Sequence, residues 1–328
     1  MTTVTPRDIR AARERIVDKV VRTPTVLSQS LSEQLSVLVH LKLEHRQTTG
    51  SFKLRGASNA VASLSSEEKA CGVVASSTGN HGRALAHAAK LEGMRAVICM
   101  SRLVPGNKLD EIRRLGAEVR IVGNSQDEAQ QEVERLVAQE GLVMLPPFDH
   151  PAIIAGQGTL GLEMIEQVPD AALVLVQLSG GGLASGIAAA IKGISCRTKV
   201  IGVSMARGAA MKASLDAGRP VEVEELPTLA DSLGGGIGLD NRLTFAMCRD
   251  LLDDVVLLSE DEIAAGIRHA YEQEREIVEG AGAVGIAELL AGKVRVNGPV
   301  VVLLSGRNID MNTHRKIICG DAIAERAA

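Results

Sequence analysis

The feature that most constrains the fold is a repeated alternation between short apolar runs rich in β-branched residues and longer Ala-rich stretches. Such an alternation predicts parallel strands joined by crossover helices. Helices are expected to start at Asn80, Pro105 and Ser125 and just after Gly182. The predicted strands are VVASS near 73, RAVICM near 95, AEVRIVG near 117, ALVLVQL near 172, TKVIGVS near 198 and PVVVLLS ending at Ser305.

The strands are continuous apolar runs, so helices should cover both faces of each sheet. We therefore predict an α/β protein with two open, mostly parallel twisted sheets covered by helices. A length of 328 residues, at roughly 150 residues per domain, predicts two domains, with PPFDHP at 146–151 as a junction. Residues 1–68 and 152–328 are predicted to form a larger domain, and residues 69–151 a smaller one.

Composition argues against nucleic acid and membranes as partners. The chain has 36 Lys and Arg against 40 Asp and Glu, without a long run of either sign, so no basic surface is expected. One Tyr, three Phe and no Trp leave few platforms for stacking on single-stranded nucleic acid. No apolar stretch is long enough to span a membrane, and no signal peptide is evident. Five cysteines without CxxC spacing are typical of reduced thiols, so we expect a cytoplasmic protein.

Four glycine-marked segments stand out among the 33 glycines of the chain. Three of them directly follow a predicted strand, and in open α/β sheets ligands bind at the carboxyl ends of strands. We therefore expect these loops to line one cleft. The segments are TTGSFKLRGA (48–57), SSTGNHG (76–82), LSGGGLASG (178–186) and LLSGRNID (303–310).

The run Ser179-Gly180-Gly181-Gly182 lies between a predicted strand and a helix that opens near Leu183. Consecutive glycines let backbone N–H groups converge on an anion at a helix N-terminus, which favours a bound phosphate. The alternative is a plain tight turn, but that would need one glycine rather than three. Neither GxxxxGK[ST] nor a complete GxGxxG is present, so ATP and NAD are poorly supported.

Taken alone, the other residues of these segments fit ordinary structural roles. Lys53 could be a solvated helix lysine, and Phe52 could be a core residue. Ser77, Thr78 or Asn80 could cap a helix. The seven histidines lack the spacing of a metal site, so we expect no metal hydrolase.

In order and spacing, GSFKLRGA, SSTGNHG, SGGGLASGIA and the late Ser305 together resemble the fold-type-II pyridoxal-phosphate (PLP) enzymes, specifically the threonine dehydratase and serine racemase family. The likeness covers almost the whole chain, including 23–32 and 228–263. SGRNIDM at 305–311 resembles the hydroxyectoine-utilisation dehydratase branch. The resemblance implies an architecture like that of tryptophan synthase β, with the cofactor in a cleft between the domains.

The resemblance also implies a role for each matching residue. Lys53 would bind the PLP aldehyde covalently and then act as the base at the substrate Cα. Ser305 would meet the pyridine nitrogen, and Asn80 the phenolic oxygen. Phe52 would pack beside the ring, and Glu279 would lie near it unless it is simply a carboxylate at a helix N-terminus. The phosphate would be held by Ser179, Gly180, Gly181, Gly182 and Leu183, and the substrate carboxylate by Ser77, Thr78, Gly79, Asn80 and His81.

Some positions depart from the family pattern. With Lys53, Thr78 is a catalytic candidate, but it stands where serine racemases carry a proton-donating serine, which argues against racemisation. Ser204 and Ala210 fall where relatives have acidic metal ligands, so no metal site is expected. Arg307 replaces a glycine. Either it binds an anionic or acyl-bearing part of an unusual substrate, or it forms a surface ion pair.

We therefore predict a PLP-dependent dehydratase (ammonia-lyase) of the threonine and serine dehydratase type. It would eliminate water from a β-hydroxy-α-amino acid, with a possible place in hydroxyectoine degradation. The alternatives are a racemase or β-replacement enzyme of the same fold, a dinucleotide-dependent dehydrogenase and a binding protein without activity. The expected partner is a small amino-acid substrate, and the expected assembly is a homodimer or another homo-oligomer.

Overall fold

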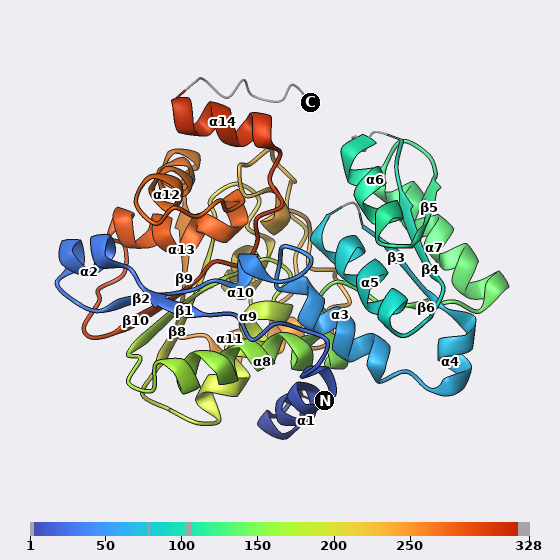
Figure 1. Ribbon diagram of the computed structural model, residues 1–328, viewed down its shortest axis with the longest axis horizontal. Coiled ribbons are helices and arrows are strands. Elements are labelled where there is room, and N and C mark those ends of the chain that lie inside the picture. The colour runs from blue at the N-terminus through green and yellow to red at the C-terminus, as the bar shows by residue number, and fades with distance from the viewer. Residues whose placement is uncertain (1–2, 78, 103–105, 321–328) are drawn as a thin grey trace.

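Two β-sheets organise the chain in the computed structural model, which describes residues 3–77, 79–102 and 106–320 (Figure 1). Every strand pair is parallel except β1 with β2. The larger sheet has the order β1 (Thr25–Leu27), β2 (Val39–Lys42), β10 (Val300–Leu303), β7 (Leu173–Gln177), β8 (Lys199–Met205) and β9 (Asp254–Leu258). The smaller sheet has the order β5 (Glu118–Ile121), β4 (Ala96–Met100), β3 (Val73–Ser76) and β6 (Val143–Met144).

Helices cover both faces of the larger sheet, as the continuous apolar runs predict (Figure 1). Alternate residues of β10 show this, since successive side chains of a strand point to opposite faces. Val300 and Val302 pack with α12 (Glu260–Glu272), α13 (Gly280–Ala291) and α14 (Met311–Cys319). Val301 and Leu303 pack with the helices of the opposite face, which are α8 (Pro151–Gln167), α9 (Gly182–Lys192), α10 (Ala210–Ala217) and α11 (Thr244–Leu251).

The smaller sheet is covered in the same way. Val73 and Ala75 pack in a core with α3 (Lys53–Ala62), α5 (Asn80–Leu91) and α6 (Gly106–Arg114). Val74 packs on the other face against α7 (Gln126–Glu140). Since α3 precedes residue 69 and yet shares the core of this sheet, the predicted domain boundaries stay a prediction. The remaining elements are α1 (Pro6–Ile16), α2 (Gln29–Leu35), α4 (Ser66–Cys71) and the 3₁₀ turns η1 (Glu44–Arg46) and η2 (Asp231–Leu233).

Helix N-termini differ in how they are capped. Those of α1, α4, α7 and α12 carry a complete capping box, in which a Ser or Thr and a Glu or Asp three residues later satisfy each other's backbone N–H groups. In contrast, α5, α9 and α13 begin without a side-chain cap from their N-cap residue. Two of them, α5 and α9, begin within segments that the sequence marks as functional, and the uncapped start of α9 is available to a ligand.

No helix within the described residues has the length and apolar character needed to cross a membrane.

Candidate active site

The start of α3 and the end of β10 are joined by backbone contacts. Phe52 N donates to Ser305 O at 3.0 Å, and Ser51 forms an isolated antiparallel bridge with Gly306. Ser305 is buried, at 2% exposure. The fold therefore places Lys53, the first residue of α3, beside the residue that the family resemblance assigns to the pyridine nitrogen.

Lys53 has the properties of a reactive amine. Its Nζ donates to the carbonyl oxygen of Pro147 at 3.1 Å and lies 5.3 Å from the ring centre of Phe52. Burial lowers the pKa of Lys53 to about 8, although the negative charge of Glu279 opposes the change. A lysine with a lowered pKa is partly neutral near neutral pH, and the neutral form is the nucleophile and the base.

The glycine run forms a close-packed turn beside Lys53. A Cβ at Gly180 would lie 2.4 Å from the ring of Phe148, which follows the Pro147 that accepts from Lys53. Gly181 has φ of +89°, a conformation that favours glycine. Gly182 opens α9, a helix that lacks a side-chain cap. The turn therefore presents backbone N–H groups and the positive end of α9, as a phosphate site requires.

Asn80 and Glu279 are in contact, although Asn80 begins α5 on the smaller sheet and Glu279 precedes α13 on the larger sheet. Asn80, which follows β3, donates from Nδ2 to Glu279 Oε1 at 2.7 Å. Asn308, which follows β10, donates from Nδ2 to Asn80 Oδ1 at 2.5 Å and from its backbone N to Glu279 Oε2 at 3.0 Å. This triangle fixes the orientation of the Asn80 amide, and no described residue accepts its second amide hydrogen, which can be donated to a ligand.

Glu279 is the N-cap residue of α13, but its side chain makes no capping hydrogen bond. Its carboxylate faces the Asn80–Asn308 pair instead. Burial, with a smaller contribution from Asp231, raises the pKa of Glu279 to about 7. The interpretation of Glu279 as an ordinary carboxylate at a helix N-terminus therefore explains neither its partners nor its burial.

In the loop before α5, some residues hold the backbone in place, whereas Gly79 has free space beside it. Ser77 Oγ accepts from Gly82 N at 3.0 Å, which is the capping role expected from the residues alone. His81 donates from Nε2 to Leu145 O at 2.8 Å, and burial, together with the charge of Lys53, lowers its pKa to about 4. A Cβ at Gly79 would have no neighbour within 4 Å. Thr78 lies outside the described residues.

Three further cleft candidates lie at the margins of this arrangement. Leu183 is buried in the core beneath the glycine turn, whereas Ser179 is partly buried at its start. Arg307 has an exposed side chain, and its charge helps to lower the pKa of His45. Its backbone N donates to Gly50 O at 2.9 Å. A role of Arg307 in substrate binding stays a prediction.

Ser204 and Ala210, which stand where relatives have acidic metal ligands, are both buried. Ser204 lies in β8 with its Oγ 3.3 Å from Met205 Sδ, and Ala210 opens α10. In the part of the chain that the structure describes, no three or more His, Cys, Asp and Glu side chains gather as a metal site would require. The absence of a divalent-cation site stays a prediction.

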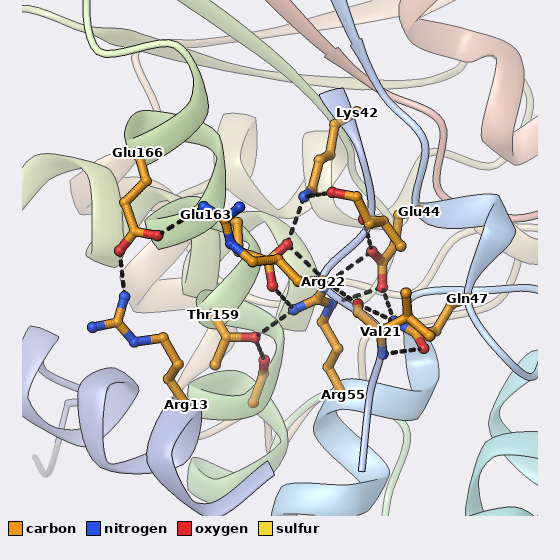
Figure 2. A network of polar contacts seen from close by, with 12 residues as sticks. Arg13, Val21, Arg22, Lys42, Glu44, Gln47, Arg55, Thr159, Glu163 and Glu166 are labelled. Carbon is orange, nitrogen blue, oxygen red and sulfur yellow. Dashed lines mark hydrogen bonds and ion pairs between the residues drawn. The ribbon is translucent and has the colours of Figure 1, made fainter. Parts of the chain in front are cut away.

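Behind the site, a buried network of charges anchors α3, the helix that begins with Lys53 (Figure 2). Arg55 donates to Glu44 at 2.7 Å and to Glu163 at 2.6 Å. Lys42 donates to Glu163 at 2.5 Å and to the carbonyl oxygen of Thr23 at 2.6 Å. The two buried cations, from β2 and α3, are thus balanced by two carboxylates, from η1 and α8.

Sequence reasoning missed three contributors to the site: Asn308, Arg83 and the Pro147–Phe148 pair. Asn308 belongs to the LLSGRNID segment, so its motif was visible even though its role was not. Arg83 follows Asn80 by three residues, a spacing that places both on one face of α5. Pro147 and Phe148 lie in PPFDHP, which the sequence marks only as a junction.

The protein-family model described as "Pyridoxal-phosphate dependent enzyme" matches residues 16–306, and the chain belongs to that family. The chain is 66% identical over 313 residues to a "Putative threonine dehydratase" of Sinorhizobium fredii, covering 95% of this chain and 94% of the relative. It is 43% identical over 316 residues to an "L-threonine ammonia-lyase" of Thermotoga maritima, covering 96% of this chain and 78% of that one.

Solved structures agree with this assignment. Maize serine racemase superposes with a TM-score of 0.91 at 32% identity, covering 97% of this chain and 98% of the other. The processed threonine deaminase isoform 2 of Solanum lycopersicum gives a TM-score of 0.88 at 36% identity, covering 95% and 90%. The predicted family, α/β fold class, PLP cofactor and dehydratase-type lyase class are thereby confirmed.

Proposed function

We propose that this enzyme eliminates water from a β-hydroxy-α-amino acid and releases an enamine, which hydrolyses to a 2-oxo acid and ammonia. The observation that carries the proposal is the position of Lys53, an amine with a lowered pKa between the Ser305 segment and the glycine turn. The likeness to a putative threonine dehydratase and an L-threonine ammonia-lyase supports this reaction.

The described residues fit PLP. Gly180, Gly181 and Gly182 would hold its phosphate, Asn80 its phenolic oxygen and Ser305 its pyridine nitrogen. When bound, PLP supplies an electron sink for the bond broken at Cα. Lys53 takes the Cα proton on Nζ, and its lowered pKa lets the same nitrogen release that proton afterwards.

A hydroxyl at position 305 favours elimination. A serine can donate a hydrogen bond to the pyridine nitrogen but, unlike a carboxylate, it does not keep that nitrogen protonated. The electron sink is then moderate, which favours rapid loss of the β-hydroxyl over return of the proton to Cα.

The test combines absorbance spectroscopy with turnover. Lys53→Ala should remove both the visible absorbance of lysine-bound PLP and the formation of 2-oxo acid from β-hydroxy-α-amino acids, whereas Lys316→Ala on α14 should leave both unchanged. Retention of the absorbance in Lys53→Ala, with borohydride trapping of PLP on another lysine, would refute the assignment.

We also propose a substrate within hydroxyectoine degradation, on the likeness of SGRNIDM at 305–311. Attachment to PLP needs a primary amine, which a cyclic amidine lacks. The substrate would then be a ring-opened, hydroxylated diaminobutyrate derivative. Turnover of such a compound at a higher kcat/KM than threonine would support this proposal, and a preference for threonine would contradict it.

Racemisation is the second candidate activity, because maize serine racemase is among the most similar folds. Chiral chromatography of serine recovered after partial turnover separates the two activities. We expect 2-oxo acid and ammonia to form faster than D-serine, since Thr78 replaces the serine that racemases use.

We propose further that the enzyme works in the cytoplasm as a homodimer or another homo-oligomer. Edge strand β1 supports an oligomer, because Val26 and Leu27 are exposed there, as are Val17 and Val21 shortly before it. Neighbouring exposed apolar side chains often mark protein interfaces. Light scattering coupled to gel filtration should give a multiple of 34.5 kDa, and a monomer would contradict the proposal.

A further inference from the structure

Arg83 is a half-buried cation at the meeting point of the two sheets. It lies on α5, which packs against both β3 and β4 of the smaller sheet. Its Nη1 donates to Asn308 Oδ1 at 3.1 Å, across to the segment that follows β10. A guanidinium has five N–H donors. Apart from the bond to Asn308, the N–H groups of Arg83 have no acceptor among the described residues.

No carboxylate within the described ranges lies within 4.0 Å of the Arg83 guanidinium. The two acids whose charges reach it are Glu111 and Glu279. Glu111 pairs with Arg114 at 2.7 Å, and Glu279 is engaged by Asn80 and Asn308. Burial lowers the pKa of Arg83, and these distant charges only partly oppose that effect. The charge of Arg83 is thus not neutralised by contact.

Two other buried cations in the fold do contact carboxylates. Arg55 and Lys42, whose side chains are 1% and 0% exposed, each contact a carboxylate at 2.7 Å or less. Figure 2 shows Arg55 between Glu44 and Glu163, and Lys42 beside Glu163. Partial burial of a cation without an anion is costly. Arg83 therefore has the character of a binding group that lacks its ligand.

Arg83 is also connected to the site. Its partner Asn308 donates to Asn80, and Asn80 donates to Glu279, whose charge in turn reaches Lys53. Arg307, the arginine that the sequence singles out, is exposed and acts on His45 instead. Of these two arginines, Arg83 is the one tied to the proposed cofactor contact.

We propose that Arg83 is a specificity-determining residue that binds an acceptor oxygen carried by the substrate beyond Cβ, either of a second carboxylate or of an acyl group. The inference rests on the proposed function, because it concerns the substrate of the same site. A guanidinium suits this task, since its planar fork can hold a carboxylate or carbonyl oxygen with charge-assisted hydrogen bonds. Such a substrate is longer or more polar than threonine.

The test compares Arg83→Gln with the natural enzyme on three substrates of similar shape: L-threo-3-hydroxyaspartate, L-threo-3-hydroxyasparagine and L-threonine. Glutamine retains an N–H donor for Asn308 but lacks the charge. We expect KM for hydroxyaspartate to rise by about tenfold or more, as loss of a hydrogen bond to a charged group predicts. KM for threonine should change by less than about twofold. A larger KM increase for hydroxyasparagine than for hydroxyaspartate would identify the acyl oxygen as the ligand.

Controls separate binding from a structural role. Arg83→Lys retains the charge and should recover part of the lost affinity for hydroxyaspartate. Arg113→Gln, an exposed position on α6, should behave like the natural enzyme. If Arg83 only joins the two sheets, Arg83→Gln will raise KM equally for all three substrates, and this result would overturn the proposal. No change with any of them would overturn it as well.

A binding experiment keeps this inference separate from the proposed reaction. Calorimetric titration of the PLP-loaded enzyme with succinate, succinamate and butyrate needs no turnover. Succinate or succinamate should bind more weakly to Arg83→Gln by about tenfold, with butyrate unaffected. Dependence on Arg83 without any dehydratase activity would refute the reaction but not the inference. Full activity with binding independent of Arg83 would refute the inference alone.

Discussion

At the scale of single residues, the site works through groups whose protonation or hydrogen bonding departs from that of an exposed side chain. Lys53 and Glu279 are the main examples: burial lowers the pKa of the lysine to about 8 and raises that of the carboxyl to about 7. Both changes have the same cause, which is that burial disfavours the charged form. Their values bring both groups close to neutral pH, where a proton-transfer site is most effective.

Replacing Ser305 should test how the ring nitrogen is controlled. In Ser305→Asp, a carboxylate would keep the pyridine nitrogen protonated, so Cα should regain its proton more often before the hydroxyl leaves. We expect elimination to slow by about tenfold or more. Ser305→Ala should weaken PLP binding by only roughly 1 kcal/mol, the contribution of one neutral hydrogen bond.

The measurement for Ser305 is turnover in D₂O. The ratio of deuterium in recovered substrate to 2-oxo acid formed should rise in Ser305→Asp and stay near that of the natural enzyme in Ser305→Ala. A Ser305→Asp enzyme with the natural ratio would show that the hydroxyl does not control the ring.

Glu279 should make the stability of the cofactor-free protein depend on pH. Its folded pKa of about 7 lies above the ordinary value of 4.5, so between these values the folded state binds more protons than the unfolded one. The stability that this carboxyl contributes is therefore complete below pH 4.5 and lost as the pH rises through 7. Glu279→Gln should remove this dependence, which is at most about 3 kcal/mol.

Thermal unfolding of both cofactor-free proteins at pH 5 and pH 8 measures the effect of Glu279. Glu288, another carboxyl with a pKa raised to about 7, is present in both and cancels in the comparison. We expect Tm of the natural protein to fall, relative to Glu279→Gln, on going to pH 8. Parallel pH dependence of the two proteins would contradict the assignment.

At the scale of elements, the site is assembled from helix starts. Helices that only support the fold, such as α1 and α12, begin with capping boxes. At α9, packing rather than a cap determines the start, because a Cβ at Gly182 would lie 2.9 Å from the backbone of Phe148. Glycine is thus required in this turn for close packing as well as for binding a ligand. The sequence alone did not separate these two requirements.

Gly181→Ala and Gly218→Ala compare a glycine of the proposed phosphate turn with a glycine outside it that has a similar backbone conformation. Both glycines have a left-handed φ, +89° and +69°, so alanine should lower stability in both proteins. Gly218 follows α10 and has open space beside it. Gly181 lies in the proposed phosphate turn, where a Cβ would lie 2.8 Å from Met211 Cε and 2.9 Å from Thr244 Cβ, so Gly181→Ala should lose more stability. Only Gly181→Ala should weaken PLP binding, by about tenfold or more. Equal PLP affinity of the two variants, by fluorescence titration, would place the phosphate elsewhere.

Some elements could be predicted from the sequence and others could not. Runs with consecutive Val, Ile and Leu became β3, β4, β5, β7, β8 and β10, and the helices expected at Asn80 and Ser125 begin at Asn80 and at Gln126, with Ser125 as the N-cap. β1 was missed because TVL is only 3 residues long, and β2 because His40 interrupts VHLK, so local pattern does not single them out. β9 was missed although it contains VVLL, because acidic residues flank this run on both sides.

At the scale of the whole molecule, contacts between segments far apart in the sequence determine the partners of buried polar side chains, which sequence patterns do not predict. Asn80 and Asn308 are 228 positions apart and share a hydrogen bond. The family resemblance assigned Asn80 a role but gave no sign of its partner. The buried charges are a second case, since Lys, Arg and Glu are expected at the surface unless paired. Their pairing depends on how β2, α3 and α8 meet.

The buried network predicts where the fold is most sensitive to loss of a single charge. Glu163→Gln would leave Lys42 and Arg55 with only the carboxylate of Glu44, and breaking a buried pair costs about 3–5 kcal/mol. Glu166, three residues further on α8, pairs with Arg13 and Arg22 at the surface, where its side chain is 45% exposed. Such pairs contribute at most about 1 kcal/mol. We expect Glu163→Gln to lower Tm of the PLP-loaded enzyme by roughly 5 °C or more and Glu166→Gln by at most a few degrees. If both variants melt at the same temperature, the network does not stabilise α3, and the position of Lys53 must depend on other contacts, such as those of Lys53 with Pro147 and of Phe52 with Ser305.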